Sequence, residues 1–278
     1  RGVLGFVRDL PQVGFVAVGA LLVAAALSAV RVDADRTAGP VAGPPPVVPT
    51  PIAGCASGTA DPSGGAYVGP AAADSVPAYV RGQGRLLAAC AAVAPDRRAL
   101  AVVSLPRPAT PGDTAGALRG VTVDTAYVVV PGHESTPYRL DLTGARDGTV
   151  AVAAAIGAAY AAAQAQFEQD RMLELARADS VRVTDPGEAA GRAAFVARAG
   201  ADDMAAGQLR SRCACVYGAV VSGRIRTLAA LRTSSVRVIA LAPAGAVAAK
   251  VVARPLLPAE TTALSGAAAP VVPEAGEL

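Results

Sequence analysis

The sequence contains no tryptophan and no asparagine, and it has one lysine, Lys250, and one histidine, His133. Aromatic residues make up only 4% of its 278 residues, too few for the stacking platforms on which proteins bind single-stranded nucleic acids. The net charge is +3, and the basic charge comes almost entirely from arginines interleaved with Asp and Glu. Because nucleic-acid binders carry a clustered basic patch, we expect no nucleic-acid partner.

Catalytic signatures are also missing. No G-x-S-x-G nucleophile elbow occurs, and Lys250 has no serine three residues before it. The histidine lies in a predicted turn, His133-Glu134-Ser135, and neighbours in sequence rarely have the geometry of a catalytic triad. We interpret this turn as solvated. The sequence therefore gives no catalytic, cofactor-binding or metal-ligating residue, and we expect no cofactor and no enzymatic activity.

Two adjacent carboxylates, Asp202 and Asp203, could bind a cation if they faced the same way. They fall within a predicted helix, where neighbouring side chains point about 100° apart, so we expect both on a solvated face. The preceding helical region holds charged residues spaced three apart, which predicts salt bridges along the outside of a helix. These residues are Glu168, Asp170, Arg171, Glu174 and Arg177.

Residues 13–30 form an uncharged, apolar run that is long enough to cross a membrane as a helix. We predict an uncleaved transmembrane anchor, with residues 1–12 in the cytoplasm. The alternative is a signal peptide cleaved near residues 26–28. In both cases the remaining chain lies outside the cytoplasm, and the Pro/Gly-rich residues 31–70 form a stalk. The predicted location is the cell membrane, single-pass, with the bulk of the chain extracytoplasmic.

Residues 71–253 are predicted to form an extracytoplasmic domain of the α/β (α+β) class. Two segments in it, residues 98–142 and 214–253, show the same order of strand, short helix, strand and strand. Within them, Ala117–Pro131 and Ala230–Pro243 align with one gap, including an Ala-Leu-Arg start and a closing proline. We interpret the two segments as βαββ-like repeats that share one mixed sheet.

A helical hairpin is predicted between the repeats, over residues 150–210. Its first helix is rich in alanine. Its second helix has clear start signals, because Asp185 can cap it and Pro186 suits the first helical position. After the second repeat the chain is rich in Pro and Ala, so residues 254–278 are predicted to be a disordered tail.

The four cysteines, Cys55, Cys90, Cys213 and Cys215, are expected to form two disulfides, because disulfides persist outside the cytoplasm. Cys213 and Cys215 lie two apart on a predicted strand and so face the same side. Joining them to each other would close a very small ring. We therefore predict the pairs Cys90–Cys215 and Cys55–Cys213, each closing a long loop that contributes roughly 4–5 kcal/mol. A zinc site and a redox-active pair are the alternatives, and both lack the usual C-x-x-C spacing.

Taken together, these patterns favour a membrane-anchored envelope protein. Abundant alanine and the absence of asparagine are typical of a GC-rich bacterial genome. Because function depends on sites and no catalytic site is visible, we expect the extracytoplasmic domain to bind or scaffold another envelope component, with an envelope protein as its partner. The alternative is an envelope hydrolase or transferase whose site follows no familiar motif. A cleft that holds His133 beside an acidic partner would favour this alternative.

Overall fold

The computed structural model describes residues 55, 60, 62–71, 74–133, 136–142, 148–231 and 235–264, which lie within one unit, residues 49–278. Here the fold mixes helices and sheets, which confirms the coarse fold class, whereas the predicted membrane anchor, residues 13–30, lies outside the described residues. The helices are α2 (Val76–Val93), α3 (Pro111–Ala117), α4 (Thr149–Ser180), α5 (Pro186–Arg210), α6 (Ile225–Ala230) and the 3-10 helix η1 (Ala248–Lys250). The strands are β1 (Ala66–Val68), β2 (Arg98–Ala109), β3 (Thr122–Val128), β4 (Tyr138–Asp141), β5 (Val216–Arg224), β6 (Val238–Leu241) and β7 (Val251–Ala253).

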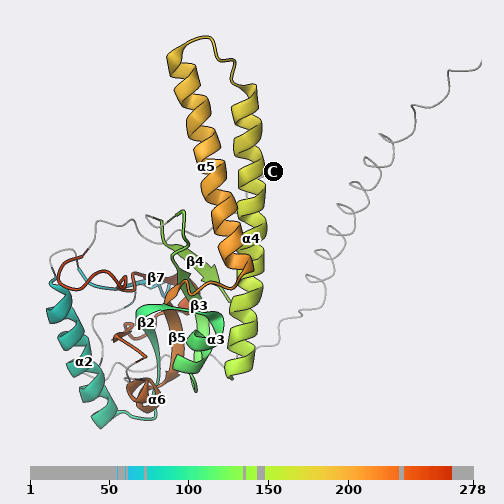
Figure 1. Cartoon of the computed structure of the whole chain (residues 1–278). Coiled ribbons are helices and arrows are strands. Elements are labelled where there is room, and N and C mark those ends of the chain that lie inside the picture. The colour runs from blue at the N-terminus through green and yellow to red at the C-terminus, as the bar shows by residue number, and fades with distance from the viewer. Residues whose placement is uncertain are drawn as a thin grey trace, which may run out of the picture. The chain divides into compact units, whose positions relative to one another are not determined.

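A five-stranded sheet of order β4-β3-β5-β2-β6 forms the centre of the body, with β5 in the middle (Figure 1). Every neighbouring pair is antiparallel. Side chains alternate between the faces, so Ala101 and Val103 of β2 pack among the helices while Val102 packs on the opposite face. That opposite face is covered by a parallel pair of strands, β1 and β7. The sheet is therefore buried between a layer of helices and a small second sheet.

The two predicted repeats share their first three elements. In the first, β2 leads through α3 to β3, and β5 lies between the two strands; in the second, β5 leads through α6 to β6, and β2 lies between them. The fourth strands differ, which corrects the second predicted βαββ unit. β4 extends the large sheet, whereas β7 pairs with β1 because its Val251 and Ala253 are buried against the opposite face. That the two segments are internal repeats stays a prediction.

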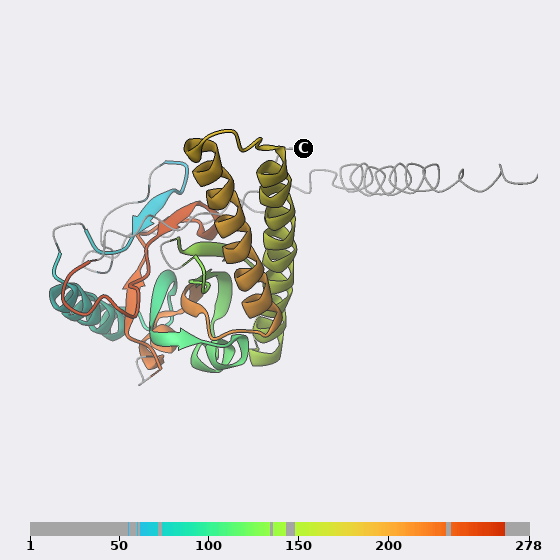
Figure 2. The ribbon, with the colours of Figure 1, turned by 45° about the horizontal axis from the view of Figure 1, so that its top comes forward.

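The predicted hairpin is present as α4 and α5, which run beyond the edge of the sheet (Figures 1 and 2). Among the described helices, α4 alone is long and apolar enough to cross a membrane. Its apolar stripe is buried in the core, and a single helix of this kind fits membrane association only weakly. The stripe consists of Val152, Ile156, Tyr160, Ala163 and Phe167.

The predicted stalk and tail both contain residues that the structure packs into the body. β1 lies within the predicted stalk, residues 31–70, and pairs with β7. In the predicted tail, Leu256 is fully buried, and its N–H donates to the hydroxyl of Ser104 at 2.9 Å. Composition misled both predictions, because proline-rich chain can still cover a sheet when it carries an apolar side chain such as Leu256. Residues 265–278 lie outside the described residues.

Candidate functional site

His133 joins a turn to the helical hairpin. Its Nε2 lies 2.9 Å from Oδ1 of Asp202 in α5, and its Nδ1 lies 3.1 Å from the hydroxyl of Tyr138 at the start of β4. With Asp202 ionised, Nε2 carries the proton and donates to the carboxylate, and Nδ1 accepts from the phenol. The interpretations of His133 as a solvated turn residue and of Asp202 as a solvated carboxylate are therefore wrong. Asp203 is exposed, as predicted, and pairs with Arg171.

The backbone of the turn brings His133 to this place. Gly132 adopts a φ of +95°, in the left-handed region that favours glycine. A Cβ at Gly132 would lie 2.9 Å from the carbonyl oxygen of Ala201 in α5, so only glycine allows the turn to approach the helix this closely. The ring of Phe167 in α4 then packs against both His133 and Tyr138, with centroid distances of 5.1 and 5.3 Å.

The electrostatics of this His133 cluster disfavour nucleophilic catalysis. Burial raises the pKa of Asp202, and His133 opposes this effect. Burial, with the negative charges of Asp202 and Asp170, raises the pKa of Tyr138 to about 12. The phenol therefore keeps its proton at neutral pH and is a poor nucleophile. Four hollows in the described part of the chain do not include His133 in their linings. The cluster thus serves as a polar connection between the turn, the sheet and the hairpin.

The cysteines pair differently from the prediction. Cys213 and Cys215 form a disulfide with each other, and Cys55 and Cys90 are free thiols. Both pairings that we predicted are therefore wrong. The reason is that β5 begins only at Val216, so the two cysteines lie in the loop after α5, where strand geometry does not hold their side chains on one face.

The two free cysteines lie next to each other. The thiol of Cys90 in α2 is hydrogen-bonded to Cys55, and burial together with this contact raises the pKa of Cys90 to about 12. Cys90 belongs to the main core, and Cys55 packs against the same core. The side chains of Cys55 and Cys90 are thus placed for a second disulfide that neither predicted pairing contained.

Hydrogen bonds anchor both ends of the Cys213–Cys215 loop. The N–H of Cys213 donates to the carbonyl of Gln208 in α5 at 3.1 Å, and Val129 donates to the carbonyl of Cys215 at 3.0 Å. Arg212, just before the loop, has a φ of +56°, which is uncommon for a residue with a side chain. Arg212 thereby turns the chain after α5, and the two cysteines lead into the start of the central strand β5.

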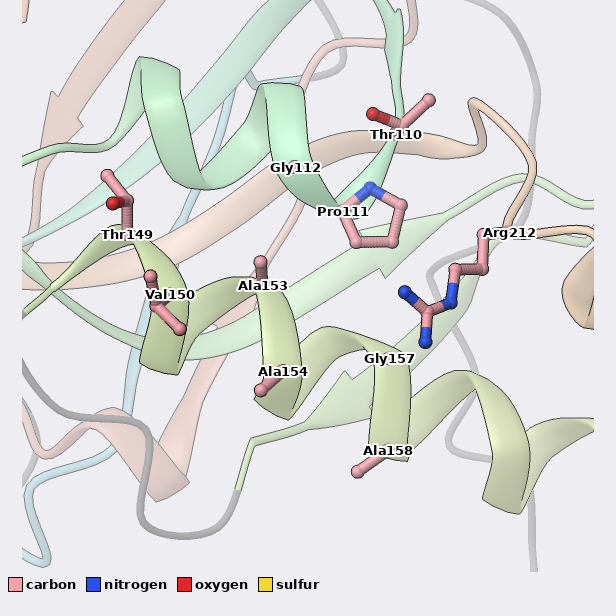
Figure 3. A pocket seen from close by; sticks show the side chains of 10 residues that line it. All are labelled: Thr110, Pro111, Gly112, Thr149, Val150, Ala153, Ala154, Gly157, Ala158 and Arg212. Atoms are coloured by element: carbon pink, nitrogen blue, oxygen red, sulfur yellow. The ribbon is translucent and has the colours of Figure 1, made fainter.

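Two hollows lie near this loop, and Gly112 in α3 lines both of them. The first has a volume of about 800 Å³, and the side chain of Arg212 points into it, across from Pro111 and α4 (Figure 3). The second has a volume of about 1150 Å³ and includes Ala214, the residue between the two cysteines. Most side chains lining the first hollow are small: Thr110, Pro111, Gly112, Thr149, Val150, Ala153, Ala154, Gly157 and Ala158.

Sequence reasoning missed Asp202 as the partner of His133, although a signal was present. The buried residues of α5 are Ala199, Asp202, Ala205, Ala206 and Leu209, so the helical period of 3.6 places Asp202 on the apolar stripe. A carboxylate on such a stripe needs a partner, because an unpaired buried charge is costly.

In the described part of the chain, no group of three or more His, Cys, Asp or Glu side chains is placed to hold a metal ion. Comparison with protein-family models, with curated proteins and with solved structures gave no match.

Proposed function

We propose that this chain is a membrane-anchored envelope protein whose extracytoplasmic domain binds another envelope protein through the α4–α5 hairpin, a role that needs no catalysis by the hairpin. The anchor and the sidedness rest on the apolar residues 13–30 and the proline-rich chain after them. The part of the hairpin beyond the sheet, residues 168–198, is named the distal hairpin here and is the proposed binding element.

The observation that carries the proposal is the near absence of buried side chains in the distal hairpin. Between Phe167 and Ala199, Ala178 is the only buried residue. The same stretch exposes large apolar side chains: Met172 is 61% exposed, and Val183 and Val196 are each 50% exposed. An element of this length with apolar groups in solvent is typical of a binding surface, because monomeric proteins rarely leave such groups clustered and uncovered.

A shallow hollow near the tip concentrates this apolar surface. It has a volume of about 600 Å³. An apolar anchor residue from a partner protein could fill a hollow of this kind, which is how binding energy is concentrated at protein interfaces. The lining consists of Val183, Ala189, Arg192, Ala193, Val196 and Ala197.

The charges of the distal hairpin favour a protein over a membrane surface. A helix that lies on a membrane presents an apolar face beside a polar face rich in Lys and Arg. Here both signs are interspersed near the tip, so a lipid headgroup layer would meet as much repulsion as attraction. The arginines are Arg177, Arg182 and Arg192, and the carboxylates are Asp179, Asp185 and Glu188.

Cross-helix contacts keep the distal hairpin in a defined shape before any partner binds. Arg198 of α5 donates to Glu174 of α4 at 3.1 Å, and Arg210 donates to Glu168 at 2.5 Å. Alanines such as Ala178 and Ala199 let the helix backbones approach closely. Preorganisation of this kind lowers the entropy cost of binding.

Photocrosslinking in intact membranes tests the proposal. A photoreactive residue is placed at Val183 or Val196, with an exposed position on α2, Val93, as the matched control. The expected result is one discrete adduct with another protein from the two hairpin positions and none from Val93. Adducts from Val93 alone, an adduct of two copies of this chain, or no adduct at all would overturn the proposal.

A loss-of-binding variant completes the test. Val183→Asp combined with Val196→Asp introduces charge at two exposed positions, so the fold is expected to survive, and the unfolding midpoint checks this. Recovery of the crosslinked partner in a pull-down should fall by about tenfold or more, since central apolar contacts contribute most of the binding energy. Undiminished recovery with a folded variant would exclude the distal hairpin as the binding element.

The anchor has a separate test. Mass spectrometry of the membrane fraction should find residues 13–30 still attached to the domain. A mature N-terminus near Ala29 would show a cleaved signal peptide instead and would remove the membrane anchor from the proposal, while the hairpin tests would stand.

A further inference from the structure

We propose that the Cys213–Cys215 disulfide is a thiol–disulfide exchange site that takes electrons from a dithiol in a partner protein. The inference does not depend on the distal hairpin. It rests on the place of the disulfide in the loop between α5 and β5, on the unequal exposure of its two cysteines, and on the hollows that open beside it.

The disulfide contributes little to holding the fold together. It joins residues that are only two positions apart. A structural disulfide stabilises mainly by closing a long loop of the unfolded chain, and its effect shrinks as that loop shortens. Both ends of the loop are also already fixed by backbone hydrogen bonds from Val129 and to Gln208. Because this disulfide stabilises the fold so little, we expect it to have a role in chemistry.

The two cysteines differ in the way that exchange chemistry needs. Cys215 is 2% exposed, and Cys213 is only partly buried. In the proposed exchange the incoming thiolate attacks the sulfur of Cys213, the less buried of the two residues, and the sulfur of the buried Cys215 acts as the internal leaving group. Once reduced, Cys215 remains beside Cys213, because its carbonyl accepts from Val129 and Val216 begins the central strand.

The surroundings leave room for a peptide. Arg212 lines one hollow, and Ala214, the residue between the two cysteines, lines the other. Both linings are dominated by small side chains and proline, so the backbone of an extended partner segment can approach the loop at Arg212 and Ala214.

The exchange is balanced in two steps. A substrate thiolate attacks the sulfur of Cys213, which forms a mixed disulfide and releases Cys215 as a thiolate that takes up a proton. The second substrate thiolate then attacks the substrate sulfur of the mixed disulfide, and Cys213 leaves and is protonated. The substrate loses two electrons and gains a disulfide, and the protein gains two thiols. Return to the starting state requires a second disulfide compound as oxidant.

The first test measures stoichiometry with the full-length chain in detergent. The Cys55→Ser/Cys90→Ser double variant serves as background, so that Cys213 and Cys215 are the only cysteines. The probe is a short peptide with two cysteines, added in reduced form. The expected result is one peptide disulfide per protein chain and two new thiols on the protein, with continued turnover once oxidised glutathione is supplied. Peptide oxidation no faster than without protein would overturn the proposal.

The second test traps the mixed disulfide in the reverse direction. In this background, Cys215→Ser leaves Cys213 as the only thiol, and its attack on the oxidised peptide releases one peptide thiol. The Cys213→Ser variant leaves only the buried Cys215. We expect at least about tenfold more adduct with Cys215→Ser, since attack depends on access. Equal adducts from the two variants would contradict the assignment of Cys213 as the attacked sulfur. If either variant fails to fold, the proposal is judged by the first test, in which one peptide disulfide and two protein thiols should form per chain.

Discussion

Nε2 of His133 lies 2.9 Å from Oδ1 of Asp202, a contact between residues 69 positions apart in the chain. It connects the turn after β3 to the middle of α5. Asp202 is 6% exposed, so the contact is the means by which a carboxylate on the apolar stripe of α5 finds a partner.

Replacing Asp202 by alanine should destabilise the protein by about 1–3 kcal/mol, because the His133 donor loses its partner in a partly buried site. Asp203→Ala is the matched control. Asp203 is its neighbour in sequence but is exposed, and its ion pair with Arg171 lies at the surface. Loss of such a pair should change stability by less than about 0.5 kcal/mol. Urea denaturation measures both, and equal losses would contradict the assigned role of Asp202.

Asp202→Asn should change how stability depends on pH. The pKa of Asp202 is raised above its ordinary value of 3.8, chiefly by burial. As pH rises, the unfolded chain loses this proton before the folded chain does. The stabilising contribution is therefore complete below the ordinary pKa and disappears as pH rises through the folded pKa. Across that window the variant should gain stability relative to the wild type. A constant difference between the two would show that Asp202 is not perturbed.

Gly218→Ala should be strongly destabilising. Gly218 lies in the central strand β5, where a Cβ would be 2.5 Å from Cβ of Pro255 and 2.9 Å from the carbonyl oxygen of Val103. Overpacking of this kind costs about 1–3 kcal/mol or more. At Gly207 in α5 a Cβ would meet nothing within 4 Å, so Gly207→Ala should stabilise by about 0.5–1 kcal/mol. Thermal unfolding of the two variants measures both changes in stability. A Gly218→Ala variant as stable as the wild type would contradict the close approach of Pro255.

Leu256→Ala should cost about 2–5 kcal/mol, the usual loss for a large side chain in a core. Leu256 is fully buried and packs with Val76 and Val238, although its sequence context predicted a disordered tail. Val93→Ala, at an exposed position of α2, should change stability by less than about 0.5 kcal/mol. Chemical denaturation that finds no difference between these variants would restore the prediction of a tail beginning at residue 254.

Non-reducing peptide mapping should find Cys55 linked to Cys90 in protein isolated from membranes. The two thiols are already in contact, and disulfides form readily outside the cytoplasm, so this outcome also depends on the proposed location. Cys90→Ser should then destabilise the oxidised protein by about 2–4 kcal/mol. In reduced protein, the pKa of Cys90 of about 12 predicts slow alkylation. A Cys90–Cys215 peptide, or free Cys55 and Cys90 in the isolated protein, would refute this pairing.

Local signals in the sequence were enough to predict several elements. Asp185 caps α5 by accepting from the N–H groups of Gly187 and Glu188, and Pro186 takes the first helical position. Glu174 and Arg177 form an i,i+3 ion pair at 2.8 Å. These features depend on residues within one turn of each other, so propensity and spacing determine them before the chain folds.

The candidate site around His133 could not be predicted from such local signals. Asp202 and His133 lie 69 positions apart, and nothing local to either residue specifies the other. The same holds for Cys55 and Cys90. A prediction that placed Cys213 on a strand gave the wrong pairing, because the boundary of β5 is set by its partners β2 and β3 and not by its own residues.

The sequence by itself determined the alternation of the strands, the start of α5 and the mixed α and β class, since these depend on the period of apolar residues and, for α5, on the cap at Asp185. Only the tertiary structure decided that β7 leaves the large sheet, that Leu256 closes a buried cluster, and that Cys213 bonds to Cys215. Those outcomes depend on which surfaces remain uncovered once the sheet has formed, and that is a property of the packed chain as a whole.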